Sequence, residues 1–274
     1  MHGRRLYANG APPFAGKMAA MNSSRPLPLA GQTILVTGGA RRVGAAIARR
    51  LQTAGANIAL HYRSSRVEAA ALADALNGER AGSAAVFAAD LLDIAALNAM
   101  VSGVKAHFGR LDALVNNASS FFPTPLGQID ETAWNDLVGS NFKAPLFLAQ
   151  AAAPFLNDRG GAIVNITDIH AERPLPGYPL YSAAKGALLT LTRALAIELG
   201  PRVRVNAVAP GAILWPEDGQ LGAGEARRDI IEHTLLKREG APEDIAGAVH
   251  FLLAEATYMT GQVLNIDGGR TAHL

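Results

Sequence analysis

Short apolar runs alternate with longer amphipathic stretches along most of the chain. The runs have the length and composition of β-strands and cover Thr33–Thr37, Asn57–His61, Ala84–Ala89, Leu111–Val115, Ala162–Thr167, Val203–Val208 and Gln262–Ile266. Helical patterns lie between them at Val43–Thr53, Val67–Leu76, Ile94–Phe108, Glu131–Leu156, Tyr181–Leu199 and Pro242–Ala254. Strands that are apolar nearly throughout are buried on both faces. The alternation therefore predicts an α/β fold, with one doubly wound parallel sheet of about seven strands and helices on both faces.

Two segments fall outside this alternation. Residues 1–29 are rich in Gly, Pro, Ala and Ser, so we expect a disordered arm ahead of a single domain at 30–274. Paired arginines near the start do not indicate an export leader, because prolines, a glycine and a lysine interrupt the apolar stretch that such a leader needs. Residues 210–240 contain several glycines without clear periodicity, which favours a functional lid over a plain surface insertion.

Composition excludes several classes of function. Only 18% of the residues are charged and the net charge is +2, with basic residues scattered, so nucleic acid is not an expected partner. The chain has no cysteine, which excludes disulfides, thiolate catalysis and zinc–thiolate sites. No apolar stretch approaches the length of a membrane span, and we expect a cytoplasmic protein. His170 and His233 lack metal-ligand spacing, so we expect surface or packing histidines and no metal site.

A glycine-rich turn follows the first expected strand. Gly38, Gly39 and Gly44 would let backbone N–H groups approach a pyrophosphate at the N-terminus of the next helix. Arg42 stands where such loops commonly place their middle glycine. The turn predicts a dinucleotide site that has been modified at one position.

The residues after the second strand favour NADPH over NADH. An NAD-preferring site would carry an acidic residue here to accept from the adenosine ribose. The chain instead offers Arg63, Ser64 and Ser65, which are donors suited to a 2′-phosphate. Asp90 and Leu91 end the third strand, where they can reach the adenine, and the turn Asn116–Ser119 ends the fourth.

Tyr181 and Lys185 are four residues apart at the start of a helix and therefore share one face. An ammonium group one turn away favours the phenolate, so we expect it to lower the pKa of Tyr181 toward the range useful for general acid catalysis. A chance Tyr/Lys pair on an amphipathic helix is the alternative for this spacing alone.

These motifs together resemble the short-chain dehydrogenase/reductase family from about Gly31 to the end of the chain. The matching pieces are "TGGARRVG", "NNAS", Asn141, "YSAAK", "APG" and "GQVLNIDGG". The resemblance implies a Rossmann-like sheet, a catalytic Tyr181–Lys185 pair, an Asn141 that holds a proton-relay water, and a homotetramer.

One departure narrows the resemblance. Family members that act on alcohols or ketones carry Ser thirteen residues before the tyrosine, and this chain has Asp168 there. A carboxylate would repel a developing alkoxide, so Asp168 suits a substrate rich in N–H donors, or one that must be protonated on nitrogen. With Arg42, "HYRSS" and "NNASSFFPTPL", it is similar to the pteridine reductase branch, and the short "HYRSS" indicates a bacterial-type member.

That branch implies NADPH-dependent reduction of a C=N bond in a dihydropterin, or in dihydrofolate, with the proton passing through Tyr181 or Asp168. The alternatives are a ketone or 3-ketoacyl reductase and, more remotely, a non-catalytic NADP(H)-binding sensor. The expected catalytic residues are Asp168, Tyr181, Lys185 and Asn141. The expected cofactor contacts are Gly38, Arg41, Arg42, Val43, His61, Tyr62, Arg63, Ser64, Ser65, Asp90, Leu91, Asn117, Ala118, Ser119, Thr167, Tyr181, Lys185, Pro210 and Gly211. The expected substrate contacts are Arg42, Ser119, Phe121, Asp168, Tyr178, Tyr181, Leu214 and Trp215.

Overall fold

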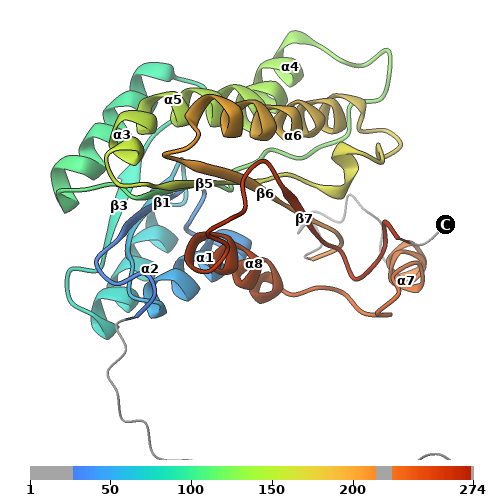
Figure 1. The fold of residues 1–274 in the computed structure, drawn as a ribbon. Helices are drawn as coiled ribbons and strands as arrows, with labels where there is room; N and C mark the ends of the chain where they lie inside the picture. Colours follow the sequence, from blue (N-terminus) through green and yellow to red (C-terminus); the bar gives the residue numbers. More distant parts are fainter. Residues whose placement is uncertain (1–26, 214–223, 273–274) are drawn as a thin grey trace, which may run out of the picture.

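Seven parallel strands form one sheet at the centre of the protein (Figure 1). The computed structural model of the 274-residue chain describes residues 27–213 and 224–272. The strands are β1 (Thr33–Val36), β2 (Asn57–Tyr62), β3 (Ala84–Ala88), β4 (Ala113–Asn116), β5 (Ala162–Ile166), β6 (Arg204–Pro210) and β7 (Val263–Ile266). Their order is β3-β2-β1-β4-β5-β6-β7, and every neighbouring pair is parallel. The predicted doubly wound sheet is confirmed.

Helices cover both faces of this sheet. They are α1 (Arg42–Thr53), α2 (Arg66–Glu79), α3 (Ile94–Phe108), α4 (Glu131–Val138), α5 (Ala144–Asn157), α6 (Pro179–Leu199), α7 (Glu225–Glu232) and α8 (Pro242–Ala254). Figure 1 shows α1, α2 and α8 on one face and α3, α5 and α6 on the other. Each layer buries its own apolar cluster against the strands, and β1 and β5 are buried at every residue. Two-sided burial explains why their sequences read as unbroken apolar runs.

Side chains at the helix ends explain several boundaries. The carboxylate of Asp93 accepts from the N–H of Ala95 at 2.8 Å and so caps the start of α3, and Gly109, with φ 73°, follows the last residue of this helix. Asp130 caps α4 through the N–H of Ala133 at 2.7 Å. Such caps satisfy backbone donors that the helix itself cannot pair. The bounds of α3 and α8 agree with the prediction, whereas other elements differ by a few residues.

The prediction of a single helix over Glu131–Leu156 was wrong. α4 and α5 are joined by a π-helical turn, η1 (Gly139–Lys143), and a π-helix accommodates an extra residue per turn. Gly139 lies against Leu92, whose side chain would be 2.3 Å from a Cβ at this position. Glycine is needed here because a side chain would collide with Leu92, and the periodicity of apolar residues does not show this contact.

The segment 210–240 also contains a helix that its pattern did not predict. α7 begins after Gly224, which has φ 77° and no side-chain cap, so the usual polar start signal is missing. Residues 214–223, with the predicted lid residues Leu214 and Trp215, lie outside the described residues. The lid function stays a prediction.

The predicted boundary between a disordered arm and the folded domain at residue 29 was wrong, as the burial of Leu29 shows. Leu29 is fully buried against the α1, α2 and α8 layer, and its N–H donates to the carbonyl of Ala54 at 3.0 Å. Packing therefore begins before residue 30, while residues 1–26 lie outside the described part of the chain. Among the described residues, no helix is long and apolar enough to cross a membrane.

Candidate active site

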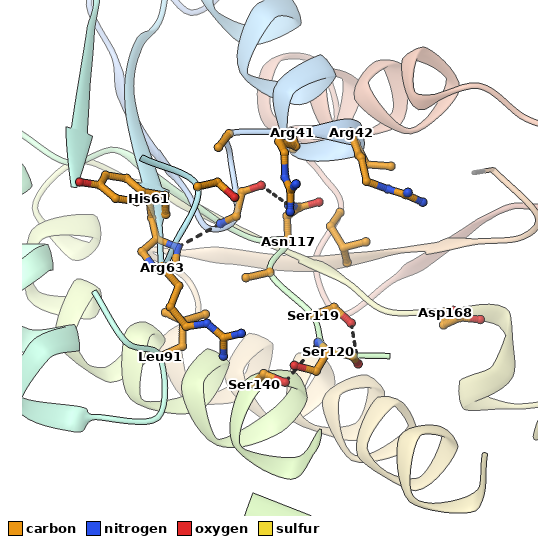
Figure 2. Close-up of a pocket in the computed structure, with 18 of the residues that line it drawn as sticks. Arg41, Arg42, His61, Arg63, Leu91, Asn117, Ser119, Ser120, Ser140 and Asp168 are labelled. Atoms are coloured by element: carbon orange, nitrogen blue, oxygen red, sulfur yellow. Dashed lines mark hydrogen bonds between the residues drawn. The ribbon is translucent and has the colours of Figure 1, made fainter. Parts of the chain in front are cut away.

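A cleft of about 480 Å³ runs along the edge of the sheet at which the strands end (Figure 2). The strand order reverses beside β1, and ligands of doubly wound sheets bind at such a switch point. All of the residues expected to contact a cofactor line this cleft. Strand ends far apart in sequence thus meet in one cavity, as the prediction required.

The loop between β1 and α1 is held close to the turn after β4. The Asn117 amide donates to the carbonyls of Thr37 at 2.8 Å and Gly38 at 3.2 Å, and the Thr37 hydroxyl accepts from the Asn117 N–H at 2.9 Å. A Cβ on Gly44 would lie 2.1 Å from the carbonyl oxygen of Gly38. Only glycine therefore allows this close approach, which opens the N-terminus of α1 to an anionic group.

Arg42 adopts a backbone conformation that favours glycine. Its φ is 52°, in the left-handed region that costs a non-glycine residue about 1–2 kcal/mol. The side chain is exposed and lines the cleft. In Figure 2 it extends on the side of the cleft where Asp168 lies, whereas Arg63 lies on the opposite side. Strain of this kind persists where a side chain has a function, which supports a role for the arginine.

The basic turn after β2 faces the same cleft. Arg63, Ser64 and Ser65 all line it, together with Arg41 from the loop before α1. Arg41 lies 3.8 Å from the carboxylate of Glu68 in the first turn of α2, and both side chains are about half exposed. The arrangement provides two arginines and two hydroxyls for a phosphate group. Glu68 was not among the predicted residues.

At the other end of the cleft, Tyr181 and Asp168 are directly bonded. The tyrosine hydroxyl donates to Asp168 Oδ2 at 2.7 Å, and the N–H of His170 donates to Asp168 Oδ1 at 2.8 Å. Asp168 follows β5, while Tyr181 lies in the first turn of α6, so the sheet and the helix position one member each. The carboxylate is thereby oriented toward the phenol.

The expected lowering of the Tyr181 pKa by Lys185 was wrong. Burial raises the pKa of Tyr181 well above its usual range, and the charge of Asp168 and the hydrogen bond to it raise it further. The Lys185 ammonium lies 5.7 Å from the centroid of the tyrosine ring and donates to the carbonyl of Ile166 at 2.9 Å. Burial lowers the pKa of Lys185 to about 8. Tyr181 is therefore held as a protonated donor.

Asn141 does not itself line the cleft but reaches it through Ser119. It lies in the π-helical turn η1, where its amide donates to the carbonyls of Ser120 at 2.9 Å and Leu137 at 3.0 Å. Its Oδ1 accepts from the Ser119 hydroxyl at 2.7 Å. The π-helical turn thus fixes a serine at the cleft wall, while the proton-relay water at Asn141 stays a prediction.

Two of the expected substrate residues lie beside the cleft rather than in its wall. Phe121 stacks on Tyr178 with ring centroids 4.6 Å apart and an interplanar angle of 13°, and it meets Tyr181 edge-on at 4.8 Å. Stacking is favourable because two aromatic faces bury each other. Tyr178, the other ring of the stack, is buried and does not line the cleft, where it was expected to edge the pocket. Arg42, Ser119, Asp168 and Tyr181 do line it.

Several residues of the cleft were not predicted as site residues. They are Ala40, Leu92, Ser120, Ser140, Ile166 and Ile213, whereas Gly44 was predicted as part of the glycine-rich turn. Ser120 directly follows the predicted Ser119 and could have been found from its place after β4. Ser140 was hidden because its position depends on the π-helical turn, where its hydroxyl accepts from the N–H of Ser120 at 3.3 Å.

The chain is similar to a family model, to curated proteins and to solved structures over most of its length. Residues 38–271 match a family model described as enoyl-(acyl carrier protein) reductase. The chain is 37% identical to pteridine reductase 1 of Leishmania tarentolae, over 91% of this chain and 98% of that protein. It is 35% identical to the 3-oxoacyl-[acyl-carrier-protein] reductase FabG of Staphylococcus aureus, over 87% and 97%. A blue fluorescent protein from a metagenomic library, solved in complex with NADPH, has a TM-score of 0.83 at 38% identity, over 89% and 99%.

Proposed function

Because this chain belongs to the short-chain dehydrogenase/reductase family, we propose that it is an NADPH-dependent reductase of a C=N bond in a reduced pterin. It is an oxidoreductase of that family, and the proposal concerns the cofactor that it uses and the substrate that it reduces. The preferred substrate would be a dihydropterin, or dihydrofolate.

The described residues fit NADPH. The close approach at Gly44 leaves the N-terminus of α1 open, where it would bind the pyrophosphate, and Arg63 with two serines of the turn after β2 lines the same cleft and would bind the 2′-phosphate. Lys185 lines the cleft beside Tyr181, where it would hold the nicotinamide ribose. When bound, the cofactor supplies a hydride.

The observation that carries the substrate proposal is the 2.7 Å hydrogen bond from the Tyr181 hydroxyl to Asp168. Ketone reduction develops negative charge on the substrate oxygen. A carboxylate about 4 Å away would oppose that charge by about 4 kcal/mol at an effective dielectric constant of about 20. This cost would lower the rate by about a thousandfold. A C=N substrate instead gains a basic nitrogen, which the same carboxylate stabilises.

The residues at this end of the cleft then have separate tasks. The Tyr181 hydroxyl, which burial and Asp168 keep protonated, would supply the proton to the ring nitrogen, and the phenolate left behind would take up a proton from solvent before the next turnover. Asp168 orients the phenol and favours positive charge on the substrate. Ser119 offers a hydroxyl to the polar edge of the heterocycle. Phe121, whose ring is half-buried with one face against Tyr178, would present its other face to a flat substrate.

A ketoacyl reductase is the second candidate, and the 35% identity to the FabG protein favours it. The two candidates make opposite demands on Asp168. A steady-state comparison of NADPH oxidation with 7,8-dihydrobiopterin and with an acetoacetyl thioester separates them. We expect turnover of the pterin; turnover of the thioester alone would overturn the proposal.

Variants of Asp168 and Tyr181 further distinguish pterin reduction from ketone reduction. Asp168→Ser should lower pterin reduction at least about tenfold and raise any ketone reduction, because the repulsion of an alkoxide is removed. Tyr181→Phe should lower both reactions by about 10²–10⁴-fold, as a proton donor requires and a non-catalytic sensor does not. The homotetramer implied by the family resemblance stays a prediction, which light scattering checks.

A further inference from the structure

A buried histidine joins three segments of the cofactor cleft. His61, in β2, is 1% exposed. Its Nδ1 lies 3.0 Å from the backbone nitrogen of Gly38, and its Nε2 lies 3.1 Å from the carbonyl oxygen of Ala89 (the former is the dashed line at His61 in Figure 2). His61 was predicted as a cofactor contact, but its bridging position could not be predicted from the sequence.

The two partners fix the protonation state of the ring. The Gly38 N–H can only donate, so Nδ1 must be an unprotonated acceptor. The Ala89 carbonyl can only accept, so Nε2 must carry the hydrogen and donate it. His61 is therefore neutral, with its single hydrogen on Nε2.

Each bonded segment contributes residues to the cleft. Gly38 belongs to the loop before α1, and the N–H of Gly39 in the same loop also donates to the His61 carbonyl at 3.0 Å. Ala89 directly precedes Asp90, which lines the cleft after β3. The turn Arg63–Ser65, which lines the cleft, begins two residues after His61. The imidazole thus spans the distance between the pyrophosphate end and the adenosine end.

We propose that His61 is a positioning residue for the dinucleotide, whose neutral imidazole sets the spacing between the phosphate loop and the adenosine side of the cleft. This inference rests on the NADPH cofactor of the proposed function. His61 acts through Gly38 and Ala89 and need not touch the cofactor. Because both ends of the cofactor depend on this spacing, its loss weakens NADPH and NAD⁺ alike.

Acid pH should weaken this arrangement. A second proton on Nδ1 would face the Gly38 N–H with another donor and break the bond. Burial lowers the pKa of His61 below its usual 6.5, and the charge of Arg63 lowers it further, while the bond to Ala89 and the charge of Asp90 oppose this. The bond is therefore intact at neutral pH and is lost as the pH falls below that pKa.

Two variants test the role by isothermal titration calorimetry. His61→Phe keeps an aromatic ring but removes both hydrogen bonds, and we expect Kd to rise about tenfold for both NADPH and NAD⁺. His61→Gln retains one acceptor and one donor that does not titrate, and we expect Kd within about threefold of the wild type. Melting curves of the cofactor-free variants show whether each remains folded.

The pH dependence supplies a readout that loss of stability would not produce. NAD⁺ is the probe because it lacks the 2′-phosphate, which itself titrates near pH 6. Its Kd should rise for the wild type as the pH falls from about 7.5 through the lowered pKa of His61, and it should stay flatter for His61→Gln, which retains Arg63 and Asp90. In addition, ¹⁵N NMR of the cofactor-free protein should show the hydrogen on Nε2.

Different results would contradict the positioning role of His61 and the cofactor proposal. Hydrogen on Nδ1, unchanged affinity in the Phe variant, or the same pH dependence in the Gln variant would overturn the positioning role. Failure of the wild-type protein to bind either dinucleotide would overturn the cofactor proposal itself.

Discussion

Arg42 offers a test in which stability and function should change in opposite directions. Arg42→Gly would remove a non-glycine residue from φ 52°. Relief of that conformation contributes about 1–2 kcal/mol, and the greater freedom of glycine in the unfolded chain takes back about 0.5–1 kcal/mol. The net expectation is a gain of about 0.5–1 kcal/mol in the free energy of unfolding.

Arg42→Ala is the matched control because it removes the same side chain but keeps the unfavourable backbone angle. The glycine variant should therefore melt about 2–4 °C above the alanine variant, since about 1 kcal/mol shifts the midpoint of a protein of this size by that amount. Differential scanning calorimetry of the two cofactor-free variants measures the difference.

Both variants should lose function to the same extent. A charge-assisted arginine–phosphate contact contributes about 1.5–3 kcal/mol, so NADPH affinity should fall at least about tenfold in each. An alanine variant as stable as the glycine variant would refute the strain argument. Unchanged NADPH affinity and pterin turnover in both would refute the role of the side chain.

Three further changes probe the charges of the cleft. Arg63→Ala should raise the Kd of NADPH far more than that of NADH in fluorescence titrations, and equal losses would contradict a 2′-phosphate site. Glu68→Gln should strengthen NADPH binding up to about fivefold without affecting NADH, because Arg41 loses an exposed partner at 3.8 Å; no difference would show that this pair does not compete with the cofactor. The kcat/KM for NADPH should fall above about pH 8, because Lys185 loses its charge there while Tyr181 stays protonated; a flat profile to pH 9.5 or so would contradict the required ammonium.

The sheet could be predicted because its signal is carried by burial. β1 and β5 are buried on both faces, so each is apolar almost throughout and stands out from the amphipathic helices. The π-helical turn at Gly139–Lys143 could not be predicted; its first residue, Gly139, packs against Leu92, a contact that no local pattern of residues indicates. The helical spacing of apolar residues continues across such a turn and does not reveal it.

In the candidate site, the cofactor end could be predicted from the sequence, whereas part of the catalytic end could not. The cofactor end depends on residues that directly follow strands, and the sequence places these in order. At the catalytic end, spacing identified Lys185 as the neighbour of Tyr181, yet the pKa of the tyrosine follows burial and Asp168, whose oxygen is 2.7 Å from the hydroxyl. Asp168 is thirteen residues away, so only the fold shows which charge is nearer. The Phe121–Tyr178 stack likewise depends on tertiary packing.

The bonds that join Thr37, Gly38 and Asn117 have a consequence for the thermodynamics of cofactor binding. These groups are satisfied by one another before any dinucleotide arrives, so the phosphate loop is preorganised. Binding then spends little conformational entropy on ordering this part of the backbone. More of the interaction free energy remains for the groups that distinguish one nucleotide from another.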